Sequence, residues 1–343
     1  MKLLIITQVV DRRDPVLGFM HRWLQEFSTH FEQLTVICLK QGDYDLPSNV
    51  QVFSLGKEVG ESRFKYVSKL FKYLWQRHRQ YDTVFVHMNQ EYVLLAGWWW
   101  RLTGKRVYMW RNHPVGNWLT WLAGYFCHRV FCTSPQSFTA QFPNTKLMPA
   151  GIDTDYFSPD PQLQRSATMV LSIGRISPAK DLETLIKAIA LVHSALPVTA
   201  MIIGDPLPEH QSYADSLRQL VTELNLNEFV SFQAGIANTE TVKWYSQAAI
   251  FINMSRPGFF DKTIFEAMAC ECPVIVSNIA LKGVIDDRCI FEYHDVEDLA
   301  QKIKGLLTLP VAERSQLGQE LRTYVHQNHS LKQLAQGLVE NLK

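Results

Sequence analysis

The stretch from residue 256 to residue 278, RPGFFDKTIFEAMACECPVIVSN, places one carboxylate, that of Glu266, inside an otherwise apolar strand–helix–strand unit. The run from Pro273 to Val276 has the composition of a buried strand. A charge in such surroundings is costly unless it has a partner. A ligand that carries hydroxyl groups would supply that partner. The alternative is that Glu266 is an exposed or capping residue of an amphipathic helix.

Short apolar strands alternate with helical segments along the chain, which has 343 residues. Because one hydrophobic core rarely grows beyond about 250 to 300 residues, this length predicts two domains. The alternation is typical of parallel, doubly wound sheets with helices on both faces, which bind ligands at the carboxyl ends of their strands. The expected strands cover 3–9, 34–39, 84–87, 106–110 and 129–132, and then 169–173, 199–203, 230–232, 250–252 and 274–276.

The segment SIGRISPAKDL, residues 172–182, lies at the end of the first strand of the second series. Gly174 ends that strand, and two cations, Arg175 and Lys180, follow it five residues apart. Two cations on either side of a turn can bind a pyrophosphate, with help from the N–H groups at a helix N-terminus. The alternative is a pair of solvated surface charges.

Together the two segments resemble the signature of retaining GT-B glycosyltransferases of the family-4, or group 1, type. The segment 172–182 contains the pattern G-R-x-x-x-x-K, and the run EAMACECPV that begins at Glu266 matches the second half of the signature. Two positions depart from it, because Gly258 replaces an acidic residue and Glu271 replaces a glycine. The resemblance covers nearly the whole chain and is strongest in residues 149–278.

The resemblance implies an α/β protein with the GT-B fold, in which two Rossmann-like, doubly wound domains face a central cleft. The N-terminal domain, residues 1–155, would bind the acceptor. The C-terminal domain, residues 156–325, would bind the nucleotide sugar. The last residues, 326–343, would form a helix that crosses back to the N-terminal domain.

The implied reaction transfers a sugar from a nucleoside diphosphate sugar to an acceptor hydroxyl, with retention of anomeric configuration, in polysaccharide or glycolipid assembly. No metal and no cofactor are expected, since cations of the protein would neutralise the leaving diphosphate. Two alternatives remain open. One is a nucleotide-sugar 2-epimerase of the same fold. The other is a non-catalytic sugar-nucleotide-binding protein, because Gly258 replaces an acidic residue of the signature.

The resemblance also assigns roles to individual residues. Arg175 and Lys180 would hold the diphosphate, and Glu266 would grip the ribose. The N–H groups at the start of the Glu266 helix would receive the phosphates. The predicted catalytic residues are His113, Arg175, Lys180 and Glu266, and the predicted donor-binding residues are Gly18, Gly174, Arg175, Lys180, Lys262, Thr263, Ile264 and Glu266.

Two strand ends of the first domain supply further candidates. His113 follows the strand 106–110 and precedes a proline, which favours an extended or turn geometry, and it would hold the transferred sugar or the acceptor. A structural histidine is the alternative, and His87 is a weaker candidate of the same kind. Gly18 would let the backbone approach a ligand. The charged residues 11–14 before it form either part of an acceptor site or a solvated turn.

Composition excludes several classes of function. Lys and Arg number 34 against 33 acidic residues, so no nucleic acid partner is expected. The six cysteines lack the spacing of a metal site and indicate a reduced, cytoplasmic compartment. Acidic pairs at Asp43/Asp45 and Asp153/Asp155 resemble a D-x-D metal motif, but this spacing is common by chance.

The segment SRFKYVSKLFKYLWQRHRQ, residues 62–80, has apolar side chains at helical spacing among basic ones. A basic amphipathic helix can lie on an anionic membrane, here the inner face of the cell membrane. The alternative is a surface helix whose apolar stripe packs on the sheet of the first domain.

Overall fold

The structure, a computed structural model, describes residues 1–256 and 258–342 of the chain and contains two compact units. Unit 1 comprises residues 1–151, the short segment Ala237–Thr239 and the residues from Leu331 onward. Unit 2 comprises Ile152–Ile236 and Glu240–Ser330. The breaks at residues 151 and 330 lie close to the expected boundaries at 155 and 325.

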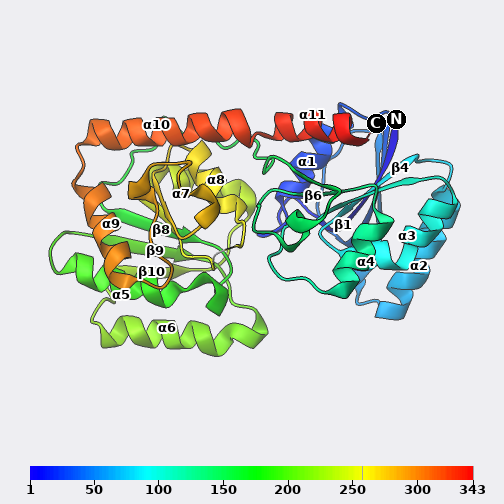
Figure 1. Cartoon of the computed structure of the whole chain (residues 1–343). Helices are drawn as coiled ribbons and strands as arrows, with labels where there is room; N and C mark the ends of the chain where they lie inside the picture. The colour runs from blue at the N-terminus through cyan, green and yellow to red at the C-terminus, as the bar shows by residue number, and fades with distance from the viewer. Residues whose placement is uncertain (257, 343) are drawn as a thin grey trace. The chain divides into compact units, whose positions relative to one another are not determined.

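In its described part, unit 1 contains one sheet of seven parallel strands in the order β3-β2-β1-β4-β5-β6-β7 (Figure 1). The chain proceeds outward from β1 in one direction and from β4 in the other, so the strand order reverses between them. In a doubly wound sheet such a reversal marks the preferred ligand position. The strands are β1 (Lys2–Val10), β2 (Gln33–Gln41), β3 (Val50–Ser54), β4 (Thr83–His87), β5 (Arg106–Trp110), β6 (Arg129–Cys132) and β7 (Thr145–Leu147).

Both faces of this sheet are covered, because alternate side chains of each strand point to opposite sides. Leu3 and Ile5 of β1 belong to one hydrophobic core, and Leu4 and Ile6 belong to the other. The last helix of the chain contributes Leu334 and its neighbours to the first core. Helices α1 (Phe19–Ser28) and α11 (Leu331–Leu342) cover the first face, and α2 (Arg63–Arg77), α3 (Gln90–Leu102) and α4 (Trp118–Phe126) cover the second.

Unit 2 is built around five parallel strands, counted over its described residues, in the order β10-β9-β8-β11-β12. Here the order reverses between β8 and β11, which pair in parallel. The strands are β8 (Met169–Ile173), β9 (Thr199–Ile203), β10 (Val230–Gln233), β11 (Ile250–Asn253) and β12 (Val274–Val276), and the helices are α5 (Leu182–His193), α6 (Gln211–Glu223), α7 (Thr241–Gln247), α8 (Lys262–Ala269), α9 (Val296–Thr308) and α10 (Val311–Asn328).

The α/β class and the two Rossmann-like sheets predicted from the sequence are confirmed. All ten expected strands form, with ends that differ by two residues or fewer. Two strands, β3 and β7, were not expected. They lie at the two edges of the unit 1 sheet and none of their residues is fully buried, so neither contains a run of buried apolar side chains.

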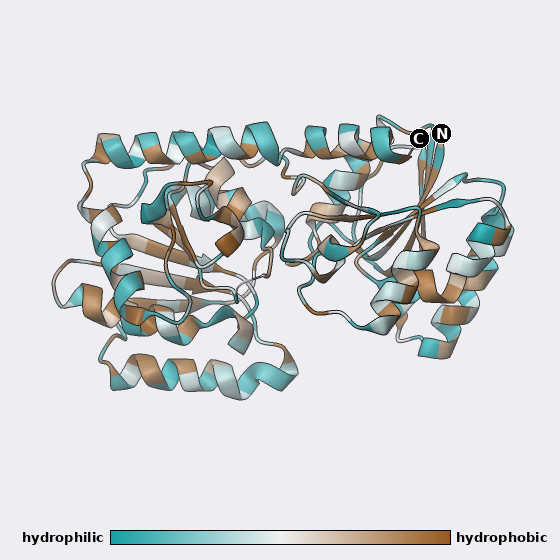
Figure 2. Cartoon of the chain, viewed as in Figure 1, coloured by the Kyte–Doolittle hydropathy of each residue, from teal (hydrophilic) through white to brown (hydrophobic). Residues whose placement is uncertain are grey.

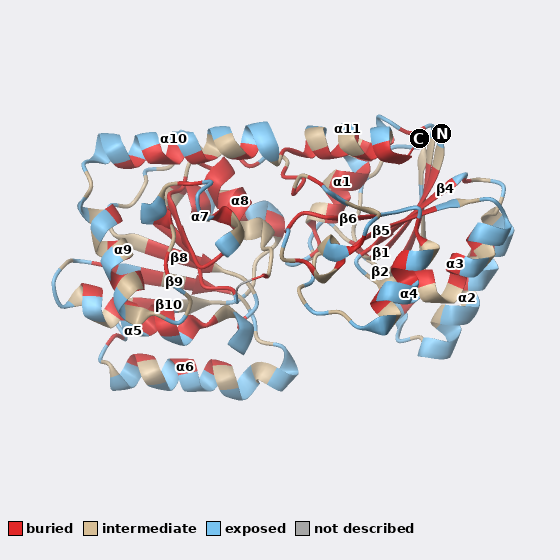
Figure 3. Cartoon of the chain, in the orientation of Figure 1, coloured by how far each residue is buried: buried red, intermediate tan, exposed pale blue. Residues whose placement is uncertain are grey.

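Hydropathy and burial follow the same pattern within each unit. The strands are coloured hydrophobic in Figure 2 and buried in Figure 3, whereas α6 and α10 expose one side. All six cysteines are free and buried. Within residues 1–256 and 258–342, no helix combines the length and the apolar composition needed to span a bilayer.

The packing of α11 gives a stability prediction. Leu338 is fully buried in unit 1, so Leu338→Ala should lower the free energy of unfolding by about 2–5 kcal/mol. Urea denaturation followed by tryptophan fluorescence measures this, since eight of the nine tryptophans belong to unit 1. The control Leu102→Ala removes a leucine that is 79% exposed and should change stability by less than about 0.5 kcal/mol. Equal effects would contradict the assignment of α11 to this core.

Candidate functional site

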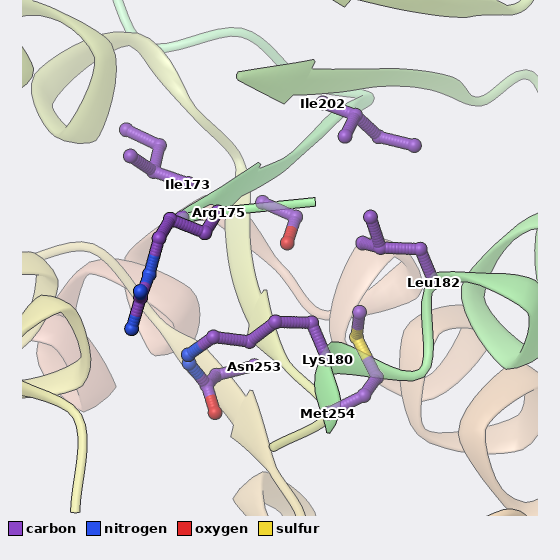
Figure 4. Close-up of a pocket in the computed structure, with 9 residues that line it drawn as sticks. Ile173, Arg175, Lys180, Leu182, Ile202, Asn253 and Met254 are labelled. Carbon is purple, nitrogen blue, oxygen red and sulfur yellow. The ribbon is translucent and has the colours of Figure 1, made fainter. Parts of the chain in front are cut away.

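A small pocket lies at the carboxyl end of β8, beside the point where the strand order of unit 2 reverses. Figure 4 shows the charged ends of Arg175 and Lys180 extending to the same side of this pocket, with Asn253 beside the Lys180 amine. Residues of β8, β9 and β11 contribute to its wall. The lining residues are Ser172, Ile173, Gly174, Arg175, Lys180, Leu182, Ile202, Asn253 and Met254.

The backbone turn at the pocket depends on two glycines. Gly174 has a φ of +155°, a backbone angle that residues other than glycine rarely adopt. Gly204 follows β9 with a φ of +157°, and a Cβ atom there would collide with the carbonyl oxygen of Gly174. The chain can therefore leave β8 and β9 at the same edge only because both positions lack a side chain.

The two predicted cations have different surroundings. Arg175 is exposed, and in the described part of the chain its guanidinium has no hydrogen-bond or ion-pair partner. Lys180 ends a short 3-10 helix, Pro178–Lys180, and precedes α5 instead of lying in its first turn. Its amine lies 2.5 Å from the carboxylate of Asp261. The alternative of two solvated charges therefore does not describe Lys180, whose side chain is 23% exposed.

Three donors converge on one oxygen of Asp261. Its Oδ2 accepts hydrogen bonds from Lys180 Nζ, from Asn253 Nδ2 at 2.9 Å and from the Ser255 hydroxyl. Lys180 also donates to Ser255 Oγ at 3.0 Å. Burial alone would raise the pKa of Asp261, but the positive charge of Lys180 and these hydrogen bonds outweigh it and lower that pKa. The carboxylate is thus held in its charged form.

Three predicted donor-binding residues form the first turn of α8. Ile264 is buried, and its N–H donates to the Asp261 carbonyl at 3.3 Å. The Thr263 hydroxyl is enclosed and has no hydrogen-bond partner among the described residues. Asp261 occupies the N-cap position, yet its side chain caps no N–H of the helix because it is turned toward Lys180.

Lys262 has the most perturbed amine of the site. Burial lowers the pKa of Lys262 to about 7, although the negative charge of Glu266 one turn further along α8 opposes the change. His329 lies nearby, where its ring contacts Phe265 and its Nε2 shares a hydrogen bond of 3.0 Å with the Tyr324 hydroxyl. Burial, together with the positive charge of Lys262, lowers the pKa of His329 to about 4. His329 is therefore neutral at physiological pH.

Glu266 is 2% exposed, so the interpretation as an exposed or capping glutamate is wrong. The hydroxyl of Tyr245, on α7, donates to Glu266 Oε2 at 3.3 Å. Burial, reinforced by the negative charge of Glu266, raises the pKa of Tyr245 well above its usual value, so Tyr245 keeps its proton and remains a donor. The partner that the sequence required for Glu266 thus includes a protein side chain.

Two candidate histidines lie in unit 1. His113 is exposed after β5, and its Nδ1 accepts a hydrogen bond from the Val115 N–H at 3.1 Å, which gives the expected turn. Its functional role stays a prediction. His87, at the end of β4, is 2% exposed and packs edge-on against Phe19 and Trp23, so the structure gives it a packing role.

Gly18 lies just before α1 and has a negative φ of −56°. The position nevertheless has no room for a side chain, because a Cβ atom there would lie 2.6 Å from the Asp14 carbonyl oxygen. In the loop before it, Arg12 and Arg13 both pair with Asp43, and Asp14 accepts two backbone N–H groups. These contacts are those of a self-contained turn.

Sequence reasoning missed several residues of the unit 2 site. Asn253 is the last residue of β11 and Ser255 comes two residues later, so the rule of inspecting strand ends would have found them. Tyr245 and His329 approach α8 from other helices, and no local pattern indicated them. Asp261 was not among the predicted site residues, and its ion pair with Lys180 was not expected.

The arrangement can bind an anion, because Arg175 and Lys180 line the pocket together with Asn253, and the hydroxyl of Ser255 lies 3.0 Å from the Lys180 amine. Within the described residues, no group of three or more His, Cys, Asp or Glu side chains is placed to hold a metal ion.

Residues 167–309 match the family model described as glycosyl transferases group 1. The chain is 27% identical to D-inositol 3-phosphate glycosyltransferase 2 of Catenulispora acidiphila, over 47% of this chain and 42% of that protein. It is 26% identical to the GDP-mannose-dependent alpha-(1-6)-phosphatidylinositol monomannoside mannosyltransferase of Mycolicibacterium smegmatis, over 48% of this chain and 47% of that protein. The matches thus span less than half the length of these curated relatives.

Solved structures show the same fold over the whole chain. Sucrose-phosphate synthase from Thermosynechococcus elongatus has a TM-score of 0.82 at 18% identity, covering 99% of this chain and 98% of that one. The Anabaena protein Alr3699/HepE, in complex with UDP and glucose, has a TM-score of 0.79 at 18% identity, covering 100% and 99%.

The low pKa of Lys262 gives a prediction for stability against pH. The unfolded chain binds this proton more readily than the folded chain between about pH 7 and the usual lysine pKa near 10.4. Raising the pH from 7 to 9 should therefore stabilise the wild type relative to Lys262→Met by about 1–2 kcal/mol. Urea denaturation at both pH values measures this difference.

The matched control is Lys187→Met, which removes a lysine of α5 that is 44% exposed. Its stability relative to the wild type should be the same at both pH values. A Lys262→Met difference that is also independent of pH would show that the Lys262 amine is solvated.

Proposed function

We propose that the chain transfers a sugar from a nucleoside diphosphate sugar to an acceptor hydroxyl with retention of anomeric configuration. The premise is that the chain belongs to the group 1 glycosyltransferases and has the GT-B fold. The observation that carries the proposal is the pocket where the order of the unit 2 strands reverses. Arg175 and Lys180 extend to one side of it, and the first turn of α8 follows the neighbouring strand. A diphosphate needs this combination of cations and backbone donors.

The chemistry assigned to these residues is stabilisation of the leaving group. When the bond between the sugar and the diphosphate breaks, negative charge grows on the departing phosphate oxygen. Arg175 and Lys180 would stabilise that charge, and Lys180 is already held in place by Asp261 and Ser255. In a retaining transfer the acceptor hydroxyl attacks the sugar from the face that the diphosphate leaves.

Glu266 is proposed to bind the ribose hydroxyls of the donor. Its carboxylate is buried and oriented by Tyr245, and a carboxylate can accept hydrogen bonds at both oxygens. His113 is proposed to hold the transferred sugar or the acceptor. Because one structural neighbour was solved with UDP and glucose and one relative depends on GDP-mannose, UDP- and GDP-sugars are the donors to test first. We propose a saccharide or a lipid-linked saccharide as the acceptor.

The activity test follows from this assignment. Purified protein should release UDP or GDP from a sugar nucleotide in the presence of an acceptor, and NMR of the product should show the donor's anomeric configuration. Lys180→Gln and Glu266→Gln should each lower kcat/KM by about 10- to 1,000-fold, because each removes a charge from the donor site. Lys187→Gln should leave kcat/KM unchanged.

Other outcomes support the alternatives. An altered sugar nucleotide formed without any acceptor would identify an epimerase. Binding of sugar nucleotides without release of UDP or GDP would identify a binding protein. Full activity in Lys180→Gln and Glu266→Gln would disprove the proposed site.

We also propose that α2 contacts an anionic membrane. Only Leu70 and Leu74 of its apolar stripe are buried, whereas Phe64 is 89% exposed and Trp75 is 72% exposed. The stripe thus packs on the sheet of unit 1 through Leu70 and Leu74, as the alternative interpretation expected, and leaves aromatic side chains at both ends of the helix exposed. Exposed aromatic side chains beside lysines such as Lys72 are suited to the interface of a bilayer with acidic lipids.

The membrane proposal predicts a dependence on both lipid charge and aromatic residues. The wild type should sediment with vesicles that contain phosphatidylserine more than with pure phosphatidylcholine vesicles. The double variant Phe64→Ser/Trp75→Ser should lose about tenfold in vesicle affinity, because two exposed rings are removed. Val311→Ser, which changes an exposed residue of unit 2, is the control. Equal sedimentation of all three proteins would refute membrane contact through α2.

A further inference from the structure

The carboxylate of Asp261 occupies an anion site that other residues build. Lys180, Asn253 and Ser255 each direct a donor at one carboxylate oxygen, Oδ2. They come from three separate positions, namely the short helix after β8, the end of β11 and the loop beyond it. A cation, an amide and a hydroxyl around one oxygen would suit a phosphate oxygen equally well.

The donors of this anion site are held by the fold independently of Asp261. Asn253 is 4% exposed at the end of β11, and its Oδ1 accepts the N–H of Ser255 at 3.1 Å. Ser255 is 5% exposed, and its carbonyl accepts the hydroxyl of Ser277 at 2.8 Å. Removing the carboxylate would therefore leave the amide and the hydroxyl in place.

Asp261 itself is less tightly held. Its side chain is 21% exposed, and within the described residues its carboxylate accepts hydrogen bonds only from the anion site and only through Oδ2. It stands at the N-cap of α8, where aspartate normally accepts N–H groups of the first turn, but it makes no such bond. The carboxylate can therefore leave the anion site without breaking a cap of α8.

We infer that Asp261 is an internal counter-ion that competes with the donor's phosphate for Lys180, an inference that rests on the proposed function. In the structure Asp261 neutralises the charge of Lys180, so Lys180 offers an incoming diphosphate no net positive charge until this ion pair opens. Donor binding then exchanges one ion pair for another. The phosphate takes the place of the carboxylate at Lys180, Asn253 and Ser255, and the carboxylate turns toward solvent, to which 21% of its side chain is already exposed.

A competing role and a supporting role predict opposite changes in phosphate affinity when the charge of Asp261 is removed. If Asp261 only oriented Lys180, its removal would weaken phosphate binding. If it competes with phosphate, its removal strengthens binding. Asp261→Asn keeps the size of the side chain and removes the charge, so it separates the two roles.

The experiment is calorimetric titration of the full chain with UDP, GDP and the corresponding nucleosides. Asp261→Asn should bind UDP or GDP about tenfold more tightly than the wild type, with unchanged affinity for uridine and guanosine. The control Asp215→Asn removes the same charge from another ion pair of unit 2, that with Arg218 on α6, and should have wild-type affinity. Tighter nucleotide binding by both variants would show a general charge effect and overturn the inference.

A second pair of variants, Lys180→Gln and the double variant Lys180→Gln/Asp261→Asn, tests the competition between Asp261 and phosphate independently of the single variant. In Lys180→Gln the carboxylate has lost its cation and repels the phosphate, so nucleotide affinity should fall. Adding Asp261→Asn to this variant should restore about tenfold of the loss. No recovery in the double variant, or weaker binding by Asp261→Asn alone, would overturn the inference.

Failure of the proposed function looks different. In that case neither the wild type nor Asp261→Asn binds UDP or GDP, although circular dichroism shows both to be folded, and the inference falls with it. Equal binding by wild type and Asp261→Asn overturns the inference alone and leaves the sugar-nucleotide site intact.

Discussion

The parallel pairing of β8 with β11 is the constraint on which the site of unit 2 depends. Because the two strands run side by side in the same direction, the chain segments that follow them leave the sheet at one edge. One segment carries Gly174, Arg175 and Lys180, and the other carries Asn253 and Ser255 and leads into α8. Lys180 therefore lies within hydrogen-bond distance of Ser255, 75 residues later in the chain, and of Asp261, 81 residues later.

The electrostatics of the site depend on how little water reaches α8. Glu266 and Lys262 are one turn apart on this helix, and both lie in surroundings that disfavour charge. Tyr245 and the neutral His329 complete these surroundings. A site of this kind can respond strongly to a charged ligand, because few solvent molecules screen the interaction.

The sequence was sufficient for features that depend on repeated patterns. Apolar runs identified ten strands, and the strand-end rule led to Arg175 and Lys180. It was insufficient where a single side-chain rotation decides the outcome. Asp261 has the sequence position of a helix cap, and only its three-dimensional neighbours turn it toward Lys180. The edge strands β3 and β7 were not predicted for another reason. None of their residues is fully buried, so their sequences lack the apolar run that identified the other strands.

The three donors around Asp261 also bear on which anions can use the site. A carboxylate attached to the chain beside its cation acts at a high local concentration, as any tethered partner does. Free inorganic phosphate or sulfate would have to displace it with charge alone. A nucleotide sugar brings a base and a ribose as well, so it gains binding energy that simple ions lack. An attached carboxylate at this position would thus lower the affinity of the site for the abundant small anions of a cell more than its affinity for a nucleotide sugar.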